Sequence, residues 1–365
     1  MRQHERIEVR PRTAGRTRRR GTFLAGLAVA SLLVSACAGG GATTAPAGSA
    51  AATPSGAASQ PATGSYPNRT INFVVPFNAG GPTDTVTRLI AEPMGKTLGQ
   101  QIVVQNVGGA GGTLGAGQVA TAAKDGYTVL MHHIGMSTAP ALYKDLPFKP
   151  LDDFRTIGLV TDVPMTIVGK KDLPPGDLKA LIDYVKANKD TLTYAHAGPG
   201  AASHLCGLLF MQAVGVKVTE VPYTGTGPAM TDLVGGQVDF MCDQTTNTTG
   251  QIKDGAIKGY AVTTKERNAA LPDLPTAAEG GLPNFEVTVW HGLYVPKDTP
   301  DEVVQKLNAA LKAALKDQNV VTKFAELGTA PVPEDQVTPE AHTERLRSQL
   351  ELWKPILEAS GATAP

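Results

Sequence analysis

The chain has 365 residues with a formal net charge of zero, which is long enough to bury a large core in two lobes. Eight Arg and two Glu fall within residues 1–36, so the remainder keeps 25 basic and 31 acidic residues, a net charge of −6. This balance excludes the basic patch that nucleic-acid binding requires. It also makes the protein a poor long-range attractor of anions, so any bound anion must be held by local N–H groups.

The N-terminus is typical of a secretory signal. Residues 2–20 are strongly basic, residues 23–36 are uncharged and mostly apolar, and small residues precede Cys37. The apolar run is too short to span a bilayer, which takes about 20 residues. Cys37 at the cleavage point resembles a bacterial lipobox, so we expect residues 1–36 to be a lipoprotein signal peptide and Cys37 to be lipidated. An ordinary signal peptide with an incidental cysteine is the alternative, and the twin-arginine and general export routes are not distinguished.

Residues 37–65 contain mainly Ala, Gly, Ser, Thr and Pro without any charge, which is the composition of a flexible tether. The folded part follows from about residue 66. No other segment is long and apolar enough to cross a membrane.

The first predicted strand, residues 71–77, runs through the turn Asn78-Ala-Gly-Gly81 into a helix over residues 83–98. N–H groups at a helix start lack intrahelical partners, and the helix dipole adds partial positive charge there. Gly80 and Gly81 lack a Cβ and let the backbone approach a ligand. The pattern predicts an anion-binding seat. Pro93 is expected to kink or shorten the helix.

Strands and helices then alternate, which predicts an α/β fold with a largely parallel sheet. A strand over 102–107, a glycine-rich turn and a helix to residue 123 are followed by a strand over 128–132, with Ser137 and Thr138 in the loop after it. Strands over 156–161 and 166–169 are expected to cross between lobes. Helices open again after strands 191–195 and 218–221, and strands 238–242, 257–262 and 288–295 precede two C-terminal helices.

Besides Cys37, the cysteines outside the leader are Cys206 and Cys242, and export makes a disulfide between them chemically feasible. Two buried thiols are the alternative. Histidines are scattered near strand ends without zinc spacing, so we predict no metal site and no cofactor. Trp290 either lines a cleft or lies in the core.

Five segments in order along the chain resemble one family. They are Val75-Pro-Phe-Asn-Ala-Gly-Gly-Pro-Thr-Asp84, Asn106-Val-Gly-Gly-Ala-Gly-Gly112, Gly198-Pro-Gly-Ala-Ala-Ser-His-Leu205, Pro222-Tyr-Thr-Gly-Thr-Gly-Pro-Ala229 and Gly236-Gln-Val-Asp239. The family is the extracytoplasmic substrate-binding receptor of tripartite tricarboxylate transporters, also called the Bug family, and the resemblance covers residues 66–361.

The resemblance implies an α/β, two-lobed type II periplasmic binding protein fold with a cleft between the lobes and two interlobe crossings. We expect lobe 1 to comprise residues 66–165 and 290–365, and lobe 2 residues 166–289. It further implies a small organic carboxylate in the cleft, namely a di- or tricarboxylate, an acidic amino acid or an aromatic acid. The resemblance also implies that the receptor delivers this carboxylate to the membrane components of a tripartite transporter. We expect the receptor to be monomeric, lipid-anchored and extracytoplasmic.

The expected ligand-binding residues lie at helix starts and strand ends of both lobes. In the first lobe they present N–H groups and hydroxyls, and Asp84 either caps its own helix, fixes the loop or accepts from the ligand. In the second lobe His204 either contacts the ligand or packs under its helix, and Gln244 follows Asp243 near the same cleft. The set is Phe77, Ala79, Gly80, Gly81, Thr83, Asp84, Ser137, Thr138, Gly200, Ala202, Ser203, His204, Tyr223, Thr224, Gly225 and Asp243.

Three competing interpretations remain. The first is a hydrolase whose catalytic triad would be Ser203 and His204 with Asp239 or Asp243. The Gly-x-Ser-x-Gly elbow of such enzymes is absent around Ser203. Adjacent residues on a helix also point in different directions, so Ser203 and His204 cannot pair. Glycines 109–117 partly match a dinucleotide-binding fingerprint without its acidic partner. A receptor that reports to a membrane sensor needs the same closing cleft, so sequence does not separate it from a transport receptor.

Overall fold

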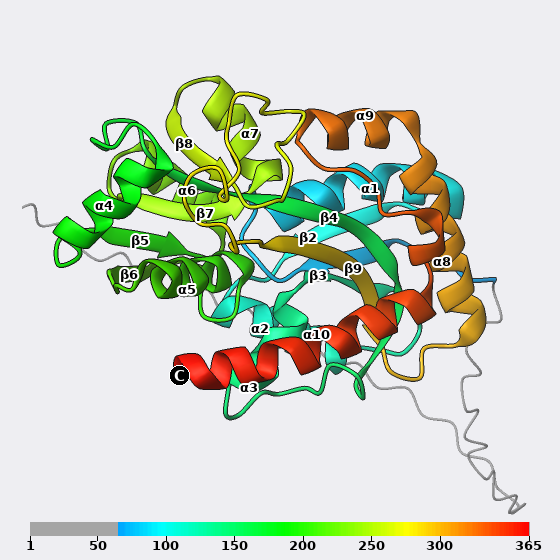
Figure 1. Cartoon of the computed structure of the whole chain (residues 1–365). Coiled ribbons are helices and arrows are strands. Elements are labelled where there is room, and N and C mark those ends of the chain that lie inside the picture. Colours follow the sequence, from blue (N-terminus) through cyan, green and yellow to red (C-terminus); the bar gives the residue numbers. More distant parts are fainter. Residues whose placement is uncertain (1–64, 365) are drawn as a thin grey trace, which may run out of the picture. The chain divides into compact units, whose positions relative to one another are not determined.

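The computed structural model describes residues 65–364, so the predicted signal peptide and Cys37 lie outside the described residues. The strands form a curled sheet in the order β2-β1-β3-β9-β4-β7-β5-β6, with β8 paired to β4 (Figure 1). The strands are β1 Ile71–Val75, β2 Ile102–Asn106, β3 Thr128–His133, β4 Phe154–Lys170, β5 Thr193–His196, β6 Thr219–Pro222, β7 Phe240–Gln244, β8 Ile257–Val262 and β9 Thr288–Pro296.

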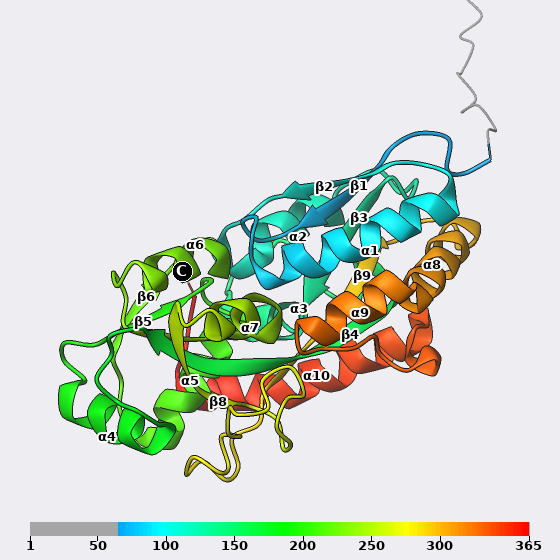
Figure 2. The ribbon, with the colours of Figure 1, turned by 90° about the horizontal axis from the view of Figure 1, so that it is seen from above.

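The long strand β4 connects two half-sheets. Its residues 154–164 pair antiparallel with β9, which continues into parallel β1, β2 and β3. Its residues 165–170 pair antiparallel with β7 and β8, and β7 continues into parallel β5 and β6. Figure 2 shows β4 running from one set of elements to the other. We call the first half-sheet with its helices lobe 1 and the second lobe 2. The exact boundaries expected from the sequence stay a prediction, because β4 belongs to both half-sheets.

Helices cover both faces of each half-sheet. In lobe 1, α1 and α8 pack together on one face while α3 and α10 pack on the other (Figure 1). In lobe 2, α5 packs on β5 and β7, and α7 packs on β4 and β8. The helices are α1 Pro82–Leu98, α2 Thr113–Ala120, α3 Gly135–Leu142, α4 Leu178–Asn188, α5 Ala202–Val214, α6 Thr226–Val234, α7 Thr245–Lys253, α8 Asp301–Lys316, α9 Gln318–Glu326 and α10 Pro339–Ser360.

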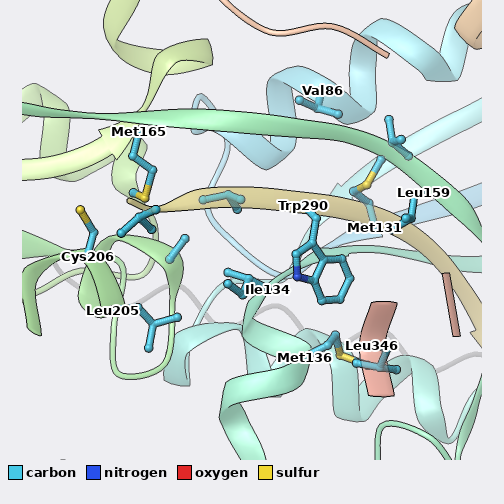
Figure 3. Close-up of a cluster of buried hydrophobic side chains, with 14 of the residues drawn as sticks. Val86, Met131, Ile134, Met136, Leu159, Met165, Leu205, Cys206, Trp290 and Leu346 are labelled. Atoms are coloured by element: carbon cyan, nitrogen blue, oxygen red, sulfur yellow. The ribbon is translucent and has the colours of Figure 1, made fainter. Parts of the chain in front are cut away.

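The main hydrophobic core runs through both lobes along β4 and β9. Trp290 on β9 is 2% exposed and belongs to this core, and Figure 3 shows it in a cluster with Ile134, Met136 and Leu346. Of the two positions expected for Trp290, the structure selects the core. Because its ring is away from the cleft lining, its fluorescence is a poor reporter of anything bound there.

Two local expectations are wrong. Ser137 and Thr138 lie in α3 rather than in a loop. The two strands expected over 156–161 and 166–169 are one continuous strand, since Val163 and Pro164 still pair with β9. Helix α1 continues past Pro93 to Leu98, so Pro93 does not shorten it. Proline keeps a helical φ and removes one N–H donor, and packing of α1 against α8 offsets that loss. Within residues 65–364, no helix combines the length and apolar character needed to cross a bilayer.

A disulfide joins Cys206 on α5 to Cys242 on β7 in lobe 2, with Cα atoms 6.0 Å apart. Both residues are at most 1% exposed. The bond ties the helix that follows β5 to the neighbouring strand β7, so it fixes the end of lobe 2 from which several loops emerge.

Replacing both Cys206 and Cys242 by Ala should lower the free energy of unfolding by about 2–4 kcal/mol, because the unfolded chain regains the entropy of a closed loop. Urea denaturation of the oxidised wild type and the double variant measures the difference. The wild type unfolded under strong reductant is the matched control and should approach the variant. Equal unfolding midpoints for oxidised and reduced protein would contradict a stabilising role for the bond.

Candidate functional site

A small enclosed cavity of about 20 Å³ lies between the two lobes, which is room for a single water. All twelve residues that line it are buried, and none is Lys or Arg. They are Phe77, Gly81, Pro82, Thr83, His133, Ala197, Ala201, Ala202, Ser203, Thr226, Asp243 and Gln244. The cavity is smaller than any dicarboxylate, so a molecule of that size enters only when the lobes separate.

Four helix N-termini meet at this cavity. Gly81 is the N-cap of α1, Ala201 that of α5 and Gln244 that of α7, and Thr226 is the first residue of α6. Each helix follows a strand whose end reaches the same edge of its half-sheet, where ligands bind in open α/β folds. The N–H groups of these first turns have no intrahelical acceptor, and each dipole places partial positive charge at the cavity. The arrangement therefore favours a bound anion without any cationic side chain.

Polar side chains complete the lining. The Ser203 Oγ accepts from the Ala197 N–H at 2.9 Å, which leaves its own proton free to donate into the cavity. The Nδ1 of His133 accepts from the Gly135 N–H at 2.9 Å, so the neutral ring carries its proton on Nε2. Gln244 is 3% exposed, and its Oε1 has no hydrogen-bond partner within residues 65–364.

The histidines near the cavity are neutral. Burial lowers the pKa of His132 to about 3, lowers that of His291 to about 4, and holds that of His133 well below its usual range. The His133 ring also stacks on Phe77, with centroids 4.7 Å apart. These rings contribute hydrogen bonds and packing at neutral pH but no positive charge. Burial raises the pKa of Asp243 to about 6, and Asn247 Nδ2 donates to its Oδ2 at 2.6 Å.

Hydrogen bonds to backbone carbonyls connect the two lobes around the cavity. The Asn78 N–H donates to the Thr224 carbonyl at 3.1 Å, and the hydroxyls of Tyr143 and Thr138 donate to the carbonyls of Pro199 and Gly200, each at 2.9 Å. These bonds cross from lobe 1 to lobe 2. The structure is therefore a closed arrangement of the two lobes.

Glycine at position 111 is required by this contact. A Cβ on Gly111 would lie 1.8 Å from the Pro199 carbonyl oxygen, and Gly111 also adopts a positive φ of 61°. Any side chain there would hold the lobes apart. The glycine-rich turn after β2 is thus a closing surface for lobe 2 rather than a dinucleotide site.

Six of the sixteen expected ligand-binding residues line the cavity: Phe77, Gly81, Thr83, Ala202, Ser203 and Asp243. Whether they bind a ligand stays a prediction. Gln244 and His133 also line the cavity. The sequence placed Gln244 only near the cleft, and it predicted no ligand contact for His133. Pro82, Ala197, Ala201 and Thr226 were missed. The first three are apolar, and only their adjacency to helix starts marks them in the sequence.

Ala79 and Gly80 are exposed and do not line the cavity, so their expected contact with a ligand stays a prediction. The Gly80 N–H is already used, because it donates to the Asp84 Oδ2 at 3.0 Å. Asp84 also accepts from Arg88 and Asn106. Although burial raises the pKa of Asp84, these hydrogen bonds from Arg88, Gly80 and Asn106 lower it overall. Of the three roles considered for Asp84, the geometry selects fixing the loop.

Six further expected residues hold the closed lobes or their own loops together. The Ser137 hydroxyl donates to the Ile134 carbonyl within lobe 1, and Thr138 makes the interlobe bond to Gly200. Thr224 accepts the interlobe bond from Asn78. The Tyr223 hydroxyl donates to Asp232 on its own helix at 2.7 Å.

Gly225 is the last member of this group, and its position is explained by crowding. A Cβ there would lie 2.9 Å from the Asn78 nitrogen. The residues at the start of α6 were expected to grip a ligand because they mirror the start of α1. They instead meet the turn after β1 directly, and only Thr226 reaches the cavity.

The hydrolase triad considered for Ser203, His204 and Asp239 or Asp243 is not formed. Ser203 Oγ bonds to the Ala197 N–H, while the Nδ1 of His204 accepts from the Gly200 N–H at 3.1 Å and its Nε2 faces Glu220 at 3.5 Å. Asp239 binds Lys170 and Thr193. No nucleophile and base are paired among these residues. His204 does not line the cavity, and its bond to the Gly200 N–H shapes the loop before α5; whether it contacts a ligand stays a prediction.

His204 belongs to a cluster with His196 and Glu220, at the edge of a groove of about 830 Å³ beside α5 and the end of α10. Both imidazole Nε2 atoms lie within 3.5 Å of the same Glu220 oxygen. Hydrogen bonds from His196 and then His204 hold the pKa of Glu220 well below its usual range. The Nδ1 atoms of both rings accept backbone N–H groups from Gly198 and Gly200.

These backbone donors decide what the cluster does. A ring whose Nδ1 accepts an N–H must carry its proton on Nε2, where a metal would need the free electron pair. Metal-binding histidines show the opposite pattern and donate from the second nitrogen. The cluster is therefore a hydrogen-bonded brace that connects Glu220 on β6 to the loop that leads into α5.

We expect Zn²⁺ to raise the melting temperature of tag-free wild-type protein no more than that of Glu220→Gln. The reason is that both Gly N–H bonds must break before the rings can bind a metal. Thermal denaturation with and without Zn²⁺ measures both proteins. A stabilisation found only in the wild type would show that the three side chains bind the metal.

Comparison with known proteins identifies the family. A family model described as "Tripartite tricarboxylate transporter family receptor" matches residues 86–361. A protein of Agrobacterium vitis, described as the UPF0065 protein in the TAR-I ttuE-ttuC' intergenic region, is 53% identical over 297 residues, which are 81% of this chain and 86% of that protein.

Solved structures agree. The periplasmic binding protein BugD is 50% identical with a TM-score of 0.80, over 82% of this chain and 99% of that one. MatC from Rhodopseudomonas palustris, solved with bound malate, is 43% identical with a TM-score of 0.78, over 80% of this chain and 100% of that one. The two-lobed fold and the solute-binding, non-enzymatic class expected from the sequence are confirmed. The chain belongs to the receptor family of tripartite tricarboxylate transporters.

Proposed function

We propose that this receptor binds a small dicarboxylate in the cavity between its lobes and delivers it to the membrane components of a tripartite tricarboxylate transporter. The observation that carries the proposal is the meeting of four helix N-termini at one buried cavity. The two lobes supply them from opposite sides, α1 from lobe 1 and α5, α6 and α7 from lobe 2. A ligand with a negative group at each end has partners on both lobes.

The energetics are sufficient without a cationic side chain. Hydrogen bonds to a charged group contribute about 1.5–3 kcal/mol each, and a helix N-terminus adds about 0.3–1 kcal/mol. Burial strengthens both, because water no longer competes inside the closed cavity. A few such contacts, less the cost of association, reach about −8 kcal/mol, which corresponds to micromolar binding.

The relatives support the ligand class. MatC is solved with malate, a dicarboxylate of the size that two opposed sets of helix starts would hold. We further propose that the mature receptor is tethered outside the cytoplasm through lipidated Cys37. That part of the proposal rests on the sequence pattern of residues 1–65.

Small dicarboxylates of four to six carbons should raise the melting temperature of residues 66–365, and the corresponding diamides should not. The amides keep the shape but lose the charge that the N–H groups recognise. A ligand present at 100 times its Kd adds about 2.7 kcal/mol to stability, which a thermal-shift screen detects. If a diamide stabilised the protein as well as its diacid, anion recognition would be wrong.

Gly81→Val should weaken binding of the best diacid by about 10–100-fold, with little change in the stability of the free protein. A Cβ at Gly81 lies 3.4 Å from the Gly227 nitrogen and 3.6 Å from the Thr226 Oγ1, so the two added methyl groups overpack the closed state, which costs about 1–3 kcal/mol. Isothermal titration measures the affinity.

The matched control is Gly250→Val on α7, where a Cβ meets nothing within 4 Å. That variant should bind as the wild type does. Undiminished affinity in Gly81→Val would place the ligand somewhere other than the cavity.

A further inference from the structure

Asp243 is an unusual residue to line an anion-binding site, because its carboxylate carries a negative charge when ionised. It is the penultimate residue of β7, is 1% exposed and lines the cavity. The Asn247 amide donates to its Oδ2 at 2.6 Å, and, against the larger effect of burial, the nearby Gln244 N–H and Thr226 hydroxyl also lower its pKa. None of these groups carries a positive charge. A ligand carboxylate in the same cavity would therefore meet a second buried negative charge.

No cationic side chain lines the cavity to compensate that charge. Among the lining residues His133 is the one titratable neighbour of Asp243, and burial keeps it neutral. The phenol of Tyr194, beneath β7, also remains neutral because burial raises its pKa well above the usual value. Like charges this close cannot both remain ionised without a large cost. Asp243 must either take up a proton or receive a hydrogen bond from the ligand.

Thr83 presents a second acceptor. The Nδ1 of His291 faces the Val289 carbonyl at 3.2 Å, and a carbonyl only accepts, so the ring proton is on Nδ1. The Nε2 of His291 is then an acceptor, and the Thr83 hydroxyl at 3.3 Å donates to it. The proton of Thr83 is thus directed away from the cavity. What the Thr83 oxygen offers a ligand is a lone pair.

We propose that Asp243, together with Thr83, selects ligands that carry a hydrogen-bond donor next to a carboxylate, meaning a hydroxyl or an ammonium group on the adjacent carbon. The inference rests on the proposed function and narrows it from dicarboxylates to hydroxy- or amino-substituted ones. The carboxylate is held by N–H groups and by Ser203. The donor substituent is held by the two acceptors, within the same small cavity.

A plain diacid lacks that donor. Its binding leaves Asp243 facing a carboxylate, so Asp243 takes up a proton. Because burial already raises the pKa of Asp243 to about 6, a nearby anion raises it further and the proton comes from solvent at pH 7.5. Affinity for a plain diacid then falls as pH rises from about 6 to 8. A donor-bearing ligand binds the ionised form, and its affinity stays level over the same range.

Isothermal titration at pH 7.5 with succinate, 2-hydroxysuccinate and 2-aminosuccinate tests the proposal. The wild type should prefer at least one substituted ligand over succinate by about tenfold or more, which is about 1.4 kcal/mol. Asp243→Asn removes the charge at constant shape and should reduce the ratio to about threefold or less, chiefly by improving succinate. The matched control Asp232→Asn, on α6 outside the cavity, should keep the wild-type ratio.

A second measurement needs no variant. Titrations of the wild type in buffers of different ionisation enthalpy give the number of protons taken up, which should be close to one for succinate and close to zero for the preferred substituted ligand. Equal affinity and equal proton uptake for both would overturn the selection by Asp243 while leaving the proposed function in place. A preference that persists in Asp243→Asn would assign it to other residues. If none of the diacids bound, the proposed function and this inference would fall together.

Discussion

The structure depends on one constraint: the cavity between the lobes offers an anion many N–H groups and no cationic side chain. Main-chain donors are fixed in place by secondary structure, so they cost no side-chain entropy when a ligand binds. They are also useful only at short range, because a chain with net negative charge outside its leader does not attract anions from a distance. Recognition is therefore decided after entry, when the lobes close and water leaves.

The rest of the fold serves that closure. The long strand β4 pairs with β9 in the half-sheet of lobe 1 and with β7 in the half-sheet of lobe 2. It therefore supports both lobes and connects them. Glycines at the contact, Gly111 above all, let backbone meet backbone across the interface. The Glu220, His196 and His204 brace holds the loop before α5, and the Cys206–Cys242 bond anchors α5 itself. Each device lies outside the cavity and acts by keeping a helix start in position.

The sequence predicted the elements well because the chain alternates apolar strands with helices that open at glycine-rich turns. For the same reason it placed Gly81 and Ser203 at helix starts, and both line the cavity. It failed where the partner of a group decides its role. The Gly80 N–H looks available in the sequence, but Asp84 takes it. Tyr223 to Gly225 repeat the pattern of the first seat, but they form the lobe contact. His133 gave no signal, since its role depends on Gly135 fixing its tautomer, and Ala197 and Ala201 are apolar.

The central claim is that helix starts, rather than charged side chains, hold the ligand's carboxylates. A crystal structure of residues 66–365 with the tightest-binding diacid tests it most directly. The account predicts one carboxylate within hydrogen-bonding distance of the first-turn N–H groups of α1, and another within that distance of Ser203 or the first turn of α5. A diacid paired with Lys or Arg, or lodged in the groove beside Glu220, would contradict it.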